Sequence, residues 1–173
     1  MKKQIIYSKF IPRLFSATLD SLVLAVLLPP ITNFISTAIY RYKFQDYIDF
    51  ANANREANNL ISIFYTQNFY DYLINTNQMS THFACSMIVA IITFLLIGIY
   101  FISFWQYFSA TPGKIILRMK IADLNTSNKP SLRQLVKRYF SYLTVPIGIW
   151  LILFTEKGQA LHDKIAATVV IKA

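Results

Sequence analysis

The chain has 173 residues, which is enough for one domain or one small membrane bundle. Hydrophobic residues make up 55% of it and charged residues only 14%, against about 25% charged residues in soluble domains. The net charge is +9, and the basic residues flank apolar runs, which is typical of cytoplasmic loops in membrane proteins. Composition therefore argues against a soluble domain and against nucleic-acid binding.

A basic N-terminal segment, residues 1–13, precedes the first apolar run, residues 14–39. We predict that this run forms a transmembrane helix, which Pro29 and Pro30 should kink or end. A secretory signal peptide is the competing interpretation, because it also combines a basic start with an apolar core. Asp20 inside the run argues against it, and so does a run longer than the roughly 7–15 residues of a signal core.

Asp20 is the most informative residue of this first helix. A carboxylate at the centre of a membrane helix costs about 2.5 to 3.5 kcal/mol and normally has a partner in a protein interior or a watery cavity. Arg13 precedes Asp20 by seven residues, a spacing that places both side chains on one helix face. The helix is therefore predicted to enter the bilayer with a charged stripe.

Residues 40–82 differ from the flanking runs because Asn, Gln, Tyr and Phe dominate them. Apolar residues recur there at helical spacing, at Leu60, Ile61, Phe64 and Tyr65. We predict an extracytoplasmic loop with one or two amphipathic helices at the membrane interface, a depth that suits aromatic residues.

The second predicted transmembrane helix covers residues 83–108, which contain no charged residue. Residues 109–138 then form a strongly basic loop, which the positive-inside rule assigns to the cytoplasm. Two spans separate this loop from the basic N-terminus, so the N-terminus is also expected in the cytoplasm. Within the loop, residues 115–122 are β-prone.

A third apolar segment, residues 139–155, is short for a span and contains Pro146 and Gly148. It either crosses the bilayer or enters and returns, and both interpretations stay open. The tail, residues 156–173, ends in a β-prone run that could pair with residues 115–122. Such pairing requires a cytoplasmic tail and favours a returning segment.

Three separated segments resemble the RDD family of small bacterial membrane proteins, named for one arginine and two aspartates. They are Arg13 with Asp20, the segment from Thr111 to Arg138 that begins Thr-Pro-Gly-Lys, and the segment from Ala160 to Val170 that contains His162 and Asp163. The resemblance implies a transport-related membrane protein, since some members are described as cation/proton antiporters. It adds five supporting motif residues to the candidate site: Thr111, Gly113, Lys114, Arg138 and His162.

The candidate polar site consists of Arg13, Asp20 and Asp163. Asp163 could be the third group that lets Arg13 bridge two carboxylates, which would leave a net negative site suited to a small cation or a proton. The alternative is a structural pair that only fixes helix packing. Three further basic residues are expected to face lipid headgroups: Arg118, Arg133 and Lys137.

No catalytic set, metal site or cofactor is predicted. His162 and His82 are expected on opposite sides of the membrane, and no zinc-type spacing or nucleophile with a base is present. We therefore do not expect an enzyme.

The fold class expected is an all-α membrane protein of the cytoplasmic (inner) membrane. It has two long transmembrane helices, a third short transmembrane or re-entrant segment, and a small cytoplasmic lobe with a β-hairpin-like pairing. The leading function hypothesis is transport, with cation/proton exchange at the polar site and a homo-oligomer to complete a pathway. The alternative is a non-catalytic membrane module that binds anionic lipid or a protein partner through its basic loop.

Overall fold

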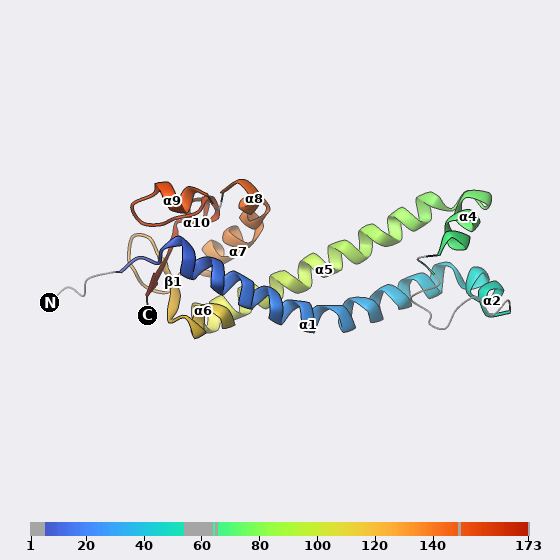
Figure 1. Cartoon of the computed structure of the whole chain (residues 1–173), viewed down its shortest axis with the longest axis horizontal. Helices are drawn as coiled ribbons and strands as arrows, with labels where there is room; N and C mark the ends of the chain where they lie inside the picture. The colour runs from blue at the N-terminus through green and yellow to red at the C-terminus, as the bar shows by residue number, and fades with distance from the viewer. Residues whose placement is uncertain (1–5, 54–63, 65, 149, 173) are drawn as a thin grey trace. The chain divides into compact units, whose positions relative to one another are not determined.

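The computed structural model describes residues 6–53, 64, 66–148 and 150–172 of the chain. Contacts divide the chain into two compact units, one made of residues 1–24 and 96–173 and the other of residues 25–95. In chain order the elements are α1 (Phe10–Lys43), α2 (Gln45–Ala53), α4 (Gln67–Asn75), α5 (Met79–Phe108), α6 (Pro112–Ile116), β1 (Met119–Asp123), α7 (Leu132–Phe140), the 3-10 helix η1 (Ser141–Thr144), α8 (Val145–Gly148), α9 (Leu151–Phe154), α10 (Leu161–Ile165) and β2 (Thr168–Lys172) (Figure 1).

Two helices in the described part of the chain are long and apolar enough to cross a membrane. α1 has 34 residues and α5 has 30. At about 1.5 Å per residue, both exceed the roughly 30 Å of a hydrocarbon core. The prediction of two long apolar helices is therefore confirmed. Both begin earlier than the predicted runs 14–39 and 83–108, and α1 also ends later.

α1 continues through Pro29 and Pro30, so the expectation that these prolines could end the helix is wrong. Each proline removes one backbone N–H donor from the helical hydrogen-bond ladder. The apolar helix segments before and after the prolines retain their other backbone hydrogen bonds. A bilayer offers no water to compete for these hydrogen bonds. Proline is for this reason better tolerated in such a helix than in an exposed one.

β1 and β2 form a two-stranded antiparallel sheet, with Met119 opposite Lys172 and Asp123 opposite Thr168. The segment before α1 adds to β2, since Tyr7 forms a bridge with Ile171. The predicted pairing between the basic loop and the tail is thus confirmed. β1 begins later than the predicted β-prone run because residues 112–116 form α6.

The third apolar segment is not one continuous helix in the described residues. It consists of the end of α7, η1, α8 and α9, none of which is long enough to span a bilayer. α10 then packs against α7, η1 and α8. Gly148 is required in α8, because a Cβ there would collide with the side chain of Leu161 at the start of α10.

The unit of residues 25–95 has an aromatic core. α2 and α4 contribute buried faces to it, and the core residues are Tyr40, Phe44, Tyr47, Ile48, Ala51, Phe64, Phe69, Leu73 and Cys85. The two short amphipathic helices agree with the predicted character of residues 40–82. The interfacial depth stays a prediction, and Leu60, Ile61 and Tyr65 lie outside the described residues.

Candidate functional site

Asp163 lies between two arginines inside the unit of residues 1–24 and 96–173. Arg13 Nη1 is 2.5 Å from Asp163 Oδ2, and Arg138 Nη1 is 2.6 Å from Asp163 Oδ1. Asp163 is 0% exposed. A buried charge is costly unless it is paired, so these three side chains depend on one another. The cluster connects the first helix, the basic loop and the tail.

The local sequence around α10 explains the position of Asp163. Gly158 adopts a positive φ of 57°, which lets the chain turn before the helix. Asp163 is the third residue of α10, and its Oδ2 accepts a hydrogen bond from the backbone N–H of Ala160 at 3.1 Å. An acidic residue is favoured in this first turn because it satisfies a free helical N–H group.

Asp20 on α1 is held by the turn that starts α6. Its carboxylate accepts hydrogen bonds from the Thr111 hydroxyl at 2.5 Å and from the backbone N–H of Gly113 at 2.8 Å. Lys114 Nζ lies 3.8 Å from Asp20 Oδ2. Asp20 is 3% exposed, so these three groups replace the water that an exposed carboxylate would bind.

The sequence of that turn is suited to a close approach between α6 and α1. Thr111 is the N-cap of α6 and Pro112 occupies its first turn, where a missing N–H costs nothing. Gly113 has no Cβ, and a Cβ there would collide with the backbone carbonyl of Ser16 on α1. The glycine therefore allows its own N–H group to reach Asp20.

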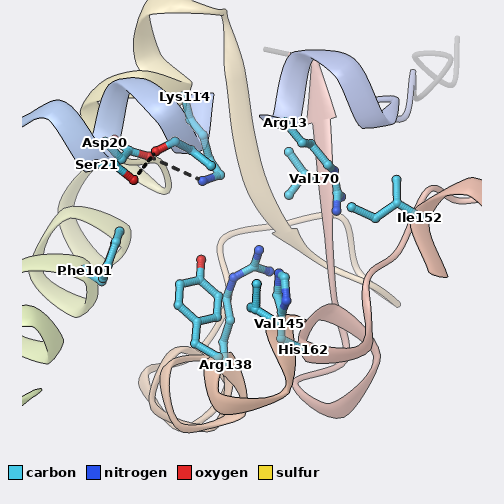
Figure 2. A pocket seen from close by; sticks show the side chains of 12 residues that line it. Arg13, Asp20, Ser21, Phe101, Lys114, Arg138, Val145, Ile152, His162 and Val170 are labelled. Carbon is cyan, nitrogen blue, oxygen red and sulfur yellow. Dashed lines mark hydrogen bonds and ion pairs between the residues drawn. The ribbon is translucent and has the colours of Figure 1, made fainter. Parts of the chain in front are cut away.

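A cavity of about 310 Å³ adjoins these groups, and Asp20 lines it. The charged side chains around it are Arg13, Asp20, Lys114 and Arg138. Figure 2 shows the ends of Arg13, Lys114 and Arg138 pointing into this shared space, with the ion pair between Asp20 and Lys114 at its edge. Ser21, Tyr142 and His162 also line it, and the remaining lining residues are apolar: Ala17, Phe101, Val145, Ile152 and Val170.

The expected bridge of Arg13 between two carboxylates is not found. Arg13 pairs with Asp163, and no ion pair joins it to Asp20 among the described residues. Asp20 pairs with Lys114 instead, because the two acids lie in different parts of the cluster. The expected net negative charge is also wrong, since Lys114 and Arg138 add two cations and leave one net positive charge.

The structure thus brings all eight predicted polar-site and motif residues into one unit, with contacts that the sequence did not reveal. Arg138 Cζ lies 5.4 Å from the ring centroid of Trp105, and Arg138 Nη1 donates to the Thr168 hydroxyl at 2.6 Å. Trp105 is 0% exposed, so its contact with Arg138 is buried. No spacing rule connects Trp105 or Thr168 to an arginine so distant in the chain.

His162 is buried next to this cluster. Its Nε2 lies 3.4 Å from Asp163 Oδ1, and its ring packs edge-on against Tyr142 at 4.8 Å between centroids. Burial lowers the pKa of His162 to about 3, although Asp163 opposes the shift. Burial would raise the pKa of Asp163, but Arg138 and Arg13 outweigh it and hold that pKa well below its ordinary value. His162 is therefore neutral and Asp163 ionised at neutral pH.

The basic residues predicted to face lipid are separate from the cavity. Arg118, Arg133 and Lys137 are all exposed. Arg133 and Lys137 lie on α7, whose buried face carries Arg138. In the described residues, no group of three or more His, Cys, Asp and Glu side chains is placed to hold a metal ion.

Comparison with known proteins agrees with the three motif segments. The sequence profile of the RDD family matches residues 7–167. The chain is 43% identical over 178 residues to "Uncharacterized protein RP437" of Rickettsia prowazekii (strain Madrid E), and the match covers 100% of both chains. No solved structure matched. A family match over nearly the whole chain, with Arg13, Asp20 and Asp163 gathered in one unit, shows that this protein belongs to the RDD family.

Proposed function

We propose that this protein is a transport protein or a transport accessory of the cytoplasmic membrane, and that Asp20 is its exchangeable group. The observation that carries the proposal is the difference between the two buried acids. Asp163 has two guanidinium partners at 2.5 and 2.6 Å, whereas Asp20 has one cationic partner in the described residues, Lys114 at 3.8 Å, and lines a cavity. Ionisable residues inside membrane helices commonly mark ion or proton pathways.

Asp163 and Asp20 then have different roles. Asp163 with Arg13 and Arg138 is a structural lock between α1, α7 and α10. Asp20 lines the cavity, and its distance from Lys114 Nζ exceeds ordinary hydrogen-bond length, so we assign the exchange with a species in the cavity to its carboxylate. Proton-coupled exchange is what the family resemblance implies, and the net positive charge of the cluster disfavours a metal cation at this position.

The proposed topology places the N-terminus, the basic loop and the tail in the cytoplasm. The pairing of Tyr7 with Ile171 and of β1 with β2 supports one common side for these three segments. The excess of basic residues in them supports the cytoplasmic side. The third apolar segment then enters the membrane surface and returns. A chain this small would require a homo-oligomer to complete a pathway.

Flux measurements in proteoliposomes test the transport proposal. Purified protein is reconstituted with a pH-sensitive dye inside the vesicles, a pH gradient is imposed, and sodium or potassium salt is added. The wild type should dissipate the gradient, and Asp20→Asn should be as slow as protein-free vesicles. Glu156→Gln, which changes an exposed acid of the tail, should retain the wild-type rate. Absence of proton, sodium and potassium flux in the wild type would refute the proposal.

A second candidate function is the binding of anionic lipid headgroups, supported by the surface of α7. Arg133 and Lys137 are exposed there beside Leu132 and Phe140, which are 54% and 53% exposed. A helix with basic and apolar side chains on its outer surface is typical of contact with a membrane interface. Glu substitution of Arg133 and Lys137 should abolish binding to phosphatidylglycerol vesicles and leave flux intact.

A further inference from the structure

The two arginines at the cavity retain buried donor groups. Arg13 uses Nη1 for Asp163, and its Nε and Nη2 are buried without a hydrogen-bond acceptor in the described residues. Arg138 uses Nη1 for Asp163 and Thr168, and its Nε likewise has no acceptor in the described part of the chain. Buried polar groups rarely stay unpaired, so three unpaired donors on two cavity-lining arginines point to an additional acceptor.

The charged side chains that line the cavity indicate that this acceptor carries a negative charge. Arg13, Lys114 and Arg138 line it with three positive charges, and Asp20 is the one acidic residue among the lining groups that the structure describes. Asp163 is already paired with both arginines. Guanidinium groups bind carboxylate and phosphate in planar, two-pronged geometry, whereas a metal cation at this position would face three like charges.

The remaining wall of the cavity selects the shape of the ligand. Its apolar residues come from α1, α5, α8, α9 and β2: Ala17, Phe101, Val145, Ile152 and Val170. A volume of about 310 Å³ corresponds to roughly ten water molecules at about 30 Å³ each. An inorganic ion would leave the apolar wall in contact with water, while an anion with a short hydrocarbon group would cover it.

We infer that this cavity binds a small organic oxyanion, with its carboxylate or phosphate on Arg13, Lys114 and Arg138 and its hydrocarbon part against Phe101 and Val145. The ligand is either a free organic acid or phosphate monoester, or the headgroup of an anionic lipid, because both present the same chemistry. If the bound anion is also the transported species, the inference rests on the proposed function. As a statement about binding it is independent of flux.

Trp105 supplies the optical signal for a binding test. The chain has 2 Trp residues, and Trp105 lies beside Arg138 while Trp150 is 58% exposed. In a Trp150→Phe background, which retains a ring to stack on Phe10, emission reports on Trp105 alone. Delipidated protein in neutral detergent is titrated with butyrate, butyl phosphate, butylammonium and butanol. Saturable emission changes are expected for the first two compounds only.

Charge variants identify the binding groups. Lys114→Gln should weaken butyrate and butyl phosphate binding by about tenfold or more, the loss typical of one charge-assisted hydrogen bond. Lys164→Gln, an exposed change on the same helix as Asp163, should leave binding unchanged. Asp20→Asn should strengthen binding several-fold, because it removes the negative charge that faces the ligand. Thermal unfolding of each variant confirms that it is folded.

An experiment in nanodiscs distinguishes a lipid headgroup from a free anion as the ligand. If a lipid headgroup occupies the cavity, phosphatidic acid in the disc should suppress the response to butyl phosphate, relative to pure phosphatidylcholine. If the ligand is a free anion, both discs should respond equally. Each of these results supports an oxyanion site.

Three results would overturn the inference: saturable binding of butylammonium with none of butyrate, loss of anion binding in Asp20→Asn, or equal binding by wild type and Lys114→Gln. Failure of the transport proposal has a different signature. Anion binding without flux would refute transport and leave this inference intact. Flux without anion binding would refute this inference and leave the transport proposal intact.

Discussion

Arg13 in α1 and Asp163 in α10 form a buried ion pair, with 2.5 Å between Nη1 and Oδ2, although 150 positions separate them in the chain. Arg138 in α7 completes the pair from the other carboxylate oxygen at 2.6 Å. Together they hold the start of the first helix, the basic loop and the tail as one unit. The second acid, Asp20, is released from this structural task and faces the cavity, which is why we assign it the exchangeable role.

Asp163→Asn should destabilise the protein strongly. The substitution leaves two buried guanidinium groups without their shared counter-charge, and breaking a buried ion pair typically costs about 3–5 kcal/mol. Thermal unfolding in detergent measures the loss. Glu156→Gln removes an exposed acid from the same tail and should change stability by less than about 0.5 kcal/mol. Equal stability of the two variants would show that the ion pairs of Asp163 do not hold α1, α7 and α10 together.

Gly113→Ala should also destabilise the protein, for a steric reason. The added methyl group collides with the carbonyl of Ser16, so α6 must move away from α1 and the N–H bond to Asp20 is lost. Overpacking of this kind costs about 1–3 kcal/mol. Ile116→Ala alters an exposed residue of the same short helix and should cost much less. Wild-type stability of Gly113→Ala would contradict the close approach of α6 to α1.

The sequence predicted which residues make up this site better than it predicted the contacts among them. The spacing of Arg13 and Asp20 on one helix face identified both residues, yet it favoured contact between them, and helical periodicity carries no information on partners from distant segments. Asp20 instead contacts Thr111, Gly113 and Lys114, which follow α5 in the chain. The Thr-Pro-Gly-Lys sequence indicated a turn at this point, but a turn signal does not show which segment the turn approaches.

Other features depended on tertiary packing and left no pattern. Trp105 resembles an interfacial aromatic residue because it lies near the end of an apolar run, but it is buried against Arg138. The pairing of β1 with β2 was predictable from two β-prone runs. The addition of Tyr7 to β2 was not, because an isolated bridge needs no alternating sequence.

Stability should depend on pH through His162. Burial keeps the folded-state pKa of His162 at about 3, against 6.5 for an unperturbed histidine. Below pH 6.5 the unfolded chain binds a proton that the folded protein does not bind, so stability should fall as the pH drops from 6.5 towards about 3. The charged groups around His162 are Asp163, Arg138, Arg13 and Lys114, and the three cations add to the effect of burial.

His162→Gln tests this assignment, because glutamine binds no proton. Unfolding midpoints of wild type and variant are compared across that pH range in the same detergent. The wild type should lose stability more steeply than the variant between pH 6.5 and about pH 4. Loss of the Asp163 charge should then affect both proteins at lower pH, because its folded-state pKa is depressed. Parallel curves for the two proteins would exclude His162 as the source.

Cysteine cross-linking tests whether the basic loop and the tail share one side of the membrane. Met119 and Lys172 are directly opposite in the antiparallel sheet, and the natural Cys85 is removed as Cys85→Ser. In native membranes, Met119→Cys with Lys172→Cys should form a disulfide on mild oxidation, because opposite residues have neighbouring Cβ atoms. Met119→Cys with Ile171→Cys is the matched control, since adjacent strand residues point to opposite faces. Cross-linking of the first pair alone requires both strands to lie on one side of the bilayer in the observed register. No cross-link in either pair would place the tail apart from the loop, and equal cross-linking of both would indicate a shifted register.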